Sequence, residues 1–99
     1  MANHGGRSVQ EVVPDWLEDT IRRLTRPGEI GSVKFHLEQQ ERILVCRPLL
    51  TNRKASGAVI GRRGATIDAI RLLASRMAEQ CTPPAWVRID VENLEDDRR

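Results

Sequence analysis

The residues best suited to bind a ligand lie in a short segment of the chain, Gly61-Arg62-Arg63-Gly64. Glycine lets the backbone approach a ligand closely and permits left-handed dihedrals. The two arginines between the glycines can donate charge-assisted hydrogen bonds to phosphate oxygens. A helical pattern of apolar residues begins directly after Gly64, and the start of a helix offers unpaired N–H groups to an anion. We therefore expect this segment to bind phosphate groups.

Basic residues are concentrated around this segment. Between Arg42 and Arg76 the chain has eight basic residues and one acidic residue, whereas the remainder has eight basic and thirteen acidic residues. The net charge of +2 thus hides a strongly basic central stretch. Such segregation of charge is typical of proteins that bind polyanions. Arg53, Lys54 and Arg71 flank the glycine segment and could extend a track of phosphate contacts.

A helix is expected near the N-terminus. Pro14 suits the first turn of a helix, and Leu17, Ile21 and Leu24 follow at helical spacing before Pro27 ends the pattern. Residues 1–13 are polar, contain glycine and show no sustained period, which predicts a flexible N-terminal tail.

A β-hairpin is expected next. Val33, Phe35 and Leu37 alternate with polar residues, which predicts a half-buried strand. After a polar turn, residues 43–46 form an apolar run that predicts a second, more buried strand, and Pro48 is expected to end it.

The C-terminal half predicts two helices and a strand. Asn52 can cap a short helix that ends at Ile60, and the apolar stripe that follows the glycine segment predicts a long helix over residues 65–80. Val87, Ile89 and Val91 alternate with polar residues and predict a third strand. Residues 94–99 form a charged C-terminal tail.

Together these elements predict one α+β domain over residues 14–93, in the order helix, strand, strand, helix, helix, strand. The three-stranded sheet is expected to bury one face under the helices. No apolar run is long enough to cross a bilayer, and the start of the chain lacks the apolar core of a signal peptide, so we expect a cytoplasmic protein. Cys46 and Cys81 have no metal-ligand spacing and are expected to be small buried hydrophobes, with neither metal nor cofactor bound.

Residues 59–70, Val-Ile-Gly-Arg-Arg-Gly-Ala-Thr-Ile-Asp-Ala-Ile, resemble the signature of the KH family of nucleic-acid-binding domains. The expected order of elements is similar to the type II, prokaryotic form of that fold, over roughly residues 14–93. Residues 61–70 and 87–93 are similar to the KH segment of the bacterial Jag (KhpB) proteins, and the small size is similar to single-KH proteins of the KhpA (YlqC) type. Two features depart from the family pattern: the stretch 48–56 is basic, and the N-terminal tail is longer than a minimal KH protein needs.

The resemblance implies that single-stranded RNA lies in an apolar groove crossed by the GxxG loop, which clamps about four backbone nucleotides. The implied RNA-binding residues are Ile60, Gly61, Arg62, Arg63, Gly64, Ala65 and Ile67, with Arg53, Lys54 and Arg71 extending the phosphate track. The implied groove floor consists of Val59, Ile60, Ile67 and Ile70, with Leu44 or Cys46 from the strand opposite. It further implies a small bacterial RNA chaperone or post-transcriptional regulator that pairs with itself or with a KhpB-type protein.

For each of these residues a structural role must be weighed against binding. Ile67, Ile70 and Leu73 are expected to serve mainly the core. Arg71 and Arg76 are more often solvated helix residues than ligand contacts. Trp16 and Trp86 are expected to pack between the first helix and the sheet.

Other classes of function compete with RNA binding. RRM and OB-type binders stack bases on aromatic platforms, whereas this chain has two Trp, one Phe and no Tyr. A protein-interaction adaptor that dimerises through the domain is the alternative, although it has no need of arginines on the loop. The sequence has no nucleophile–base pair, metal cluster or Walker lysine, so we expect neither an enzyme nor a small-molecule substrate.

Overall fold

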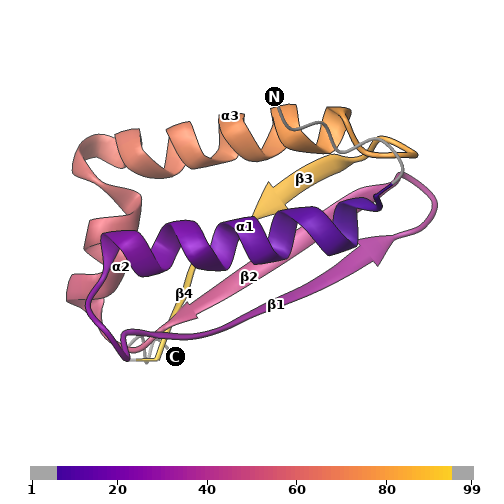
Figure 1. The fold of residues 1–99 in the computed structure, drawn as a ribbon. Coiled ribbons are helices and arrows are strands. Elements are labelled where there is room, and N and C mark those ends of the chain that lie inside the picture. The colour runs from indigo at the N-terminus through magenta and orange to yellow at the C-terminus, as the bar shows by residue number, and fades with distance from the viewer. Residues whose placement is uncertain (1–6, 95–99) are drawn as a thin grey trace.

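The computed structural model describes residues 7–94, which form three α-helices, a short 3₁₀ turn and a mixed β-sheet (Figure 1). The elements in chain order are α1 (Val9–Leu24), β1 (Ile30–Glu38), β2 (Ile43–Leu50), α2 (Arg53–Ile60), η1 (Arg62–Gly64), α3 (Ala65–Glu79), β3 (Trp86–Ile89) and β4 (Glu92–Asn93). The fold is therefore α+β. The helices α1 and α3 lie along one face of the sheet, and α2 lies at one end of the domain (Figure 1).

The first helix begins earlier than the sequence predicted. It starts at Val9, so Pro14 is the sixth residue of the helix and not part of its first turn. Val9 and Val13 are fully buried and continue the apolar stripe of Leu17 one turn further back. An interior proline removes one helical hydrogen bond and crowds the preceding turn, at a cost of about 3 kcal/mol. Burial of the two valines, at about 1.5–3 kcal/mol each, offsets that cost.

The prediction of a flexible tail over residues 1–13 is therefore wrong for residues 9–13. Residues 9–13 belong to α1, and residues 1–6 and 95–99 lie outside the described part of the chain. The Glu11 carboxylate accepts a hydrogen bond from the backbone N–H of Ser8 at 3.2 Å, which fixes the start of the helix.

The sheet has the strand order β1-β2-β3, with β1 antiparallel to β2 and β3 parallel to β2. The two-residue strand β4 also pairs with β2, in line with β3, so the sheet has four strands where three were expected. Both hairpin strands are longer than predicted, and β2 runs through Pro48 to Leu50.

Pro48 does not end β2 because its nitrogen faces a gap in the ladder. The carbonyls of Cys46 and Leu50 accept hydrogen bonds from the N–H groups of Asp90 and Leu94. Because the backbone groups of every second residue face the same neighbouring strand, the nitrogen of Pro48 also faces β3 and β4. Pairing there is interrupted between Ile89 and Glu92, and a missing N–H at that point removes no ladder bond.

The core forms between the inner face of β2 and the three helices. Leu44, Cys46 and Leu50 of β2 are fully buried against Leu17 and Ile21 of α1. Helices α2 and α3 contribute Ala55, Val59, Ile67, Ile70, Ala74 and Ala78 to the same cluster.

The two tryptophans differ in their surroundings. Trp16 packs against the core, as expected. Trp86 is 73 % exposed, so the prediction that it packs between the first helix and the sheet is wrong. Its register partner in β2 is Ile43, which alternates with the core residue Leu44, so Trp86 belongs to the outer face of the sheet.

The helical assignment of residues 9–13 can be tested by stability. Val13→Ala removes two buried methyl groups and should lower the free energy of unfolding by about 2 kcal/mol. Exposed Gln10→Ala is the matched control and should leave it nearly unchanged. Urea titration followed by circular dichroism measures both variants. Equal stability of Val13→Ala and wild type would mean that this segment does not pack on the core.

Both cysteines are buried and free, as expected. Burial raises the pKa of the Cys46 thiol to about 12, and burial also raises the pKa of Cys81. Since the thiolate is the reactive form, neither cysteine should react with iodoacetamide at neutral pH in the folded protein, while both should react in denaturant. Mass spectrometry after a timed exposure reads out the modification. Rapid labelling of the folded protein would contradict the burial of these thiols.

Candidate nucleic-acid interface

The glycine segment forms a tight turn between α2 and α3. The N–H of Gly61 closes α2 by donating to the carbonyl of Gly57 at 2.8 Å, and the N–H of Gly64 donates to the carbonyl of Gly61 at 3.1 Å. Both glycines have positive φ, 79° at Gly61 and 78° at Gly64. At Gly61 a Cβ atom would also lie 2.3 Å from Oγ1 of Thr66. Glycine is thus required at Gly61 by space as well as by backbone conformation, and at Gly64 by conformation alone.

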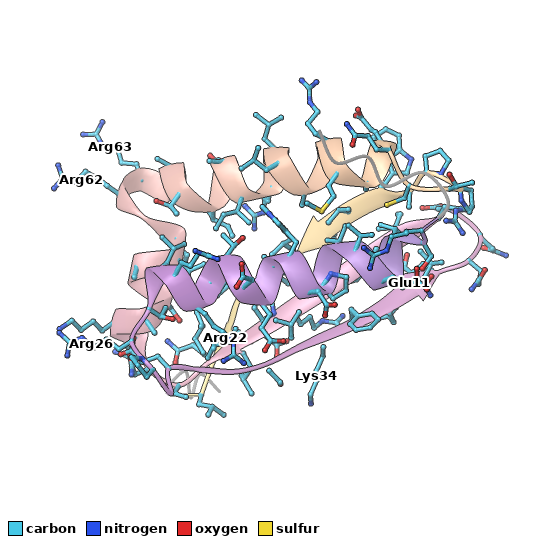
Figure 2. The ribbon with its side chains drawn as sticks, viewed as in Figure 1. Glu11, Arg22, Arg26, Lys34, Arg62 and Arg63 are labelled. Atoms are coloured by element: carbon cyan, nitrogen blue, oxygen red, sulfur yellow. The ribbon has the colours of Figure 1, made fainter. Side chains whose placement is uncertain are left out.

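Arg62 and Arg63 project into solvent from this turn (Figure 2). Both residues are exposed, and neither guanidinium has an ion-pair or hydrogen-bond partner within residues 7–94. Arg63 has φ 57° and ψ 24°, a left-handed conformation that costs a side-chain-bearing residue about 1–2 kcal/mol. The turn therefore presents two free cations on a rigid and partly strained backbone.

The start of α3 adds a favourable field for anions. Gly64 is the N-cap of this 15-residue helix and offers no side chain to cap it. The first-turn N–H groups and the positive end of the helix dipole therefore lie beside the arginines. Ala65, the first residue of α3, is exposed, so an anion can approach this end of the helix.

Arg53 and Lys54 lie at the opposite end of α2. The Asn52 side chain caps this helix as expected, accepting a hydrogen bond from the N–H of Ala55 at 2.8 Å. Both basic residues are exposed and occupy the first turn of α2, where the helix dipole disfavours cations and the turn itself contains no acidic residue. With eight residues at about 1.5 Å each, α2 separates them from the glycine turn by about 12 Å.

Arg71 is engaged with the protein itself. Its Nη2 donates to the carbonyl of Ile89 at 2.9 Å, and its Nη1 lies 3.7 Å from Oδ1 of Asp68. The guanidinium thus ties α3 to the edge strand β3. About half of the side chain stays exposed, which leaves a phosphate contact sterically open but in competition with these bonds.

The expected apolar groove floor is not an exposed surface. Ile67 and Ile70 are each 4 % exposed, and Val59, Leu44 and Cys46 are fully buried. The expectation that Ile67 and Ile70 serve the core is confirmed. The same expectation is wrong for Leu73, which is 55 % exposed. Among the exposed large apolar side chains of residues 7–94, Ile60 is the one next to the glycine turn, and it is 38 % exposed. The prediction that the buried residues contact bases is therefore wrong for this structure.

A cavity at the other end of α3 was missed from the sequence. It has a volume of about 280 Å³ and is lined by Arg42, Ser75, Glu79, Pro84, Ala85 and Trp86. One signal for the exposure of Trp86, which lines this cavity, was present in the sequence. Trp86 alternates with apolar residues and so falls on the same side of the strand as the polar residues Arg88 and Asp90. The 15 residues of α3 place this cavity about 20 Å from the glycine turn.

Neither a metal centre nor a membrane span is found in the described chain. Residues 7–94 contain no group of three or more His, Cys, Asp or Glu that could hold a metal ion. Among the helices of the same range, none is both long enough and apolar enough to cross a bilayer.

Comparison with known proteins returned no relative. The chain matches no family model, and neither a curated protein nor a solved structure is similar to it. The geometry of the chain itself therefore carries the functional interpretation.

The two glycines should differ in their tolerance of a side chain. Gly64→Ala should lower the free energy of unfolding by about 1–2 kcal/mol, since only its positive φ is unfavourable. Gly61→Ala should cost clearly more, because the added Cβ also collides with Thr66. Chemical denaturation compares the two variants directly. Equal losses, or a larger loss for Gly64→Ala, would contradict the packing of Thr66 against Gly61.

Proposed function

We propose that this protein binds single-stranded RNA without catalysis, through the turn formed by residues 61–64. The observation that carries the proposal is the pair of free guanidiniums of Arg62 and Arg63, held on a glycine turn at the uncapped start of α3. Phosphate is the ligand that these groups fit best, because guanidinium forks, helix N–H groups and close backbone approach all favour it.

The form of the surface favours a flexible single strand over a duplex. The free cations lie on a short turn, and the adjoining face of α3 carries Ala65 and Ala69, which offer no polar group to base edges. A single strand can bend around such a turn and place a base against Ile60.

The fold supports the resemblance to the KH family. Its elements follow the order helix, strand, strand, helix, helix, strand, with the two-residue strand β4 added at the end, and the glycine turn joins the second and third helices. The resemblance then suggests a cytoplasmic bacterial RNA chaperone of the KhpA type. One such site contacts about four nucleotides, so useful affinity would require a second site on the same protein or on a partner.

A protein-interaction adaptor is the alternative. Two large apolar side chains favour it, Leu72 at 56 % and Trp86 at 73 % exposure, on neighbouring elements α3 and β3. On this alternative the domain would pair with itself or with a KhpB-type protein, and RNA binding would be secondary.

Fluorescence anisotropy with short labelled RNAs tests the proposal. The variant Arg62→Asp/Arg63→Asp should lose binding, because four units of charge change beside the bound phosphates. The matched control Lys34→Asp/Arg76→Asp makes the same change in net charge at two exposed cations outside the turn. Lys34 lies on the edge strand β1, away from the arginines (Figure 2). Circular dichroism should show that both variants remain folded.

Three results would be informative in different ways. Loss of binding in the turn variant alone supports the proposal. Equal loss in both variants would show that only net charge matters and would contradict a site at the turn. Absence of binding by wild type at moderate salt would reject RNA binding and favour the adaptor.

A further inference from the structure

A second group of free cations lies at the same end of the molecule as the glycine turn. Arg26 lies just after α1, and its side chain extends outward from this end of the molecule, as do those of Arg62 and Arg63 (Figure 2). Within residues 7–94 no ion-pair or hydrogen-bond partner is found for the guanidinium of Arg26 or the ammonium of Lys54. By contrast, the neighbouring Arg22 and Arg23 pair with Glu18 and Asp19.

Glu29 holds this group together. Its carboxylate accepts a hydrogen bond from the backbone N–H of Arg26 at 2.8 Å and one from Nδ2 of Asn52 at 3.4 Å. Its own carbonyl accepts from the N–H of Thr51 at 2.9 Å. The turn that carries Arg26 is therefore fastened to the N-terminal cap of α2.

The electrostatics agree with this placement. The backbone N–H of Arg26 lowers the pKa of Glu29 most, followed by the Asn52 amide and the positive charges of Arg26 and Lys54. The hydrogen bonds give the same placement, because the backbone of Arg26 donates to this carboxylate and Lys54 lies two residues after Asn52, which also donates to it. Two cations against one anion leave a net positive patch, although they come from segments 28 residues apart in the sequence.

We propose that Arg26 and Lys54 form a second phosphate-binding patch that receives the same RNA strand after it leaves the glycine turn. This inference rests on the proposed function. The two sites lie at opposite ends of α2, about 12 Å apart along its axis. Residues 53–64 contain no acidic side chain, so a phosphate backbone that follows α2 meets no carboxylate from this segment. Basic side chains at both ends of an uncharged stretch favour a nucleic-acid strand over an acidic peptide or a lipid surface.

The patch predicts a dependence of affinity on RNA length. An oligonucleotide of about two residues is too short to span the distance of about 12 Å between the sites and contacts the glycine turn alone, whereas one of about ten residues also reaches Arg26 and Lys54. Arg26→Gln/Lys54→Gln should leave the affinity for the short RNA unchanged and lower that for the long RNA about tenfold. The slope of log affinity against log salt should fall in magnitude by about 1.4 for the long RNA, since each lost phosphate contact contributes about 0.7 for single strands.

Two further variants make the test specific. Lys34→Gln/Arg76→Gln removes two free cations elsewhere and should leave the length dependence intact. Glu29→Gln removes the one negative charge of the patch and should raise the affinity for the long RNA by a few fold. If Glu29 mattered only for holding the turn, the same substitution would instead lower that affinity.

The outcomes separate this patch from the site at the turn. If wild type and Arg26→Gln/Lys54→Gln had the same affinity for the long RNA as well as for the short RNA, the patch would be overturned. The glycine turn would then be the whole site. If poly-glutamate displaced the labelled long RNA as effectively as unlabelled long RNA does, the patch would be a general polyanion surface, and this result would also overturn the proposal. If wild type binds RNA of neither length, the proposed function itself fails.

Discussion

The inner face of β2 is the constraint on which the rest of the structure depends. Leu44, Cys46 and Leu50 are fully buried, and all three helices must cover them with their apolar faces. Val59 at the end of α2 and Ile67 at the start of α3 both reach this core, although only seven residues separate them. The chain must therefore reverse within a few residues. Gly61 and Gly64, with their positive φ, allow that reversal.

The same constraint determines what the turn offers to a ligand. Because the apolar residues on either side of the turn are used by the core, Arg62 and Arg63 can only face solvent. The N–H of Ala65 donates to the carbonyl of Arg62, and no side chain of Gly64 caps the N–H groups that follow it in α3. A site for phosphate thus follows from the way the core is closed. Such a site would bind through charge and backbone geometry, with Ile60 as the large apolar side chain beside it within residues 7–94.

Sequence reasoning located the turn and most of the elements around it, because glycine positions, caps and apolar periods are local signals. It failed where the deciding factor was tertiary. Pro14 was expected to begin the first helix, but burial of Val9 and Val13 extended that helix backwards. Pro48 was expected to end β2, but the gap between β3 and β4 tolerates it.

The same distinction holds for the candidate site. Residue types at 61–64 predicted two exposed arginines correctly, since a short turn leaves long charged side chains no buried position. The apolar groove was not predictable from period alone, because a helical stripe does not reveal whether core or ligand covers it. Ile67 and Ile70 are covered by the core. Likewise, Arg26 and Lys54 lie far apart in the sequence, and the pairing of β1 with β2 and the contacts of Glu29 bring their segments together.

The central claim is that RNA phosphates contact the turn formed by residues 61–64. The most direct measurement is an NMR titration of the ¹⁵N-labelled protein with a short single-stranded RNA, following the backbone amides and the arginine Nε–H groups. Our account predicts that the largest shifts occur at Gly61 to Ala65 and at the side chains of Arg62 and Arg63. Shifts concentrated instead at Ser75, Glu79 and Trp86, around the cavity at the far end of α3, would contradict it.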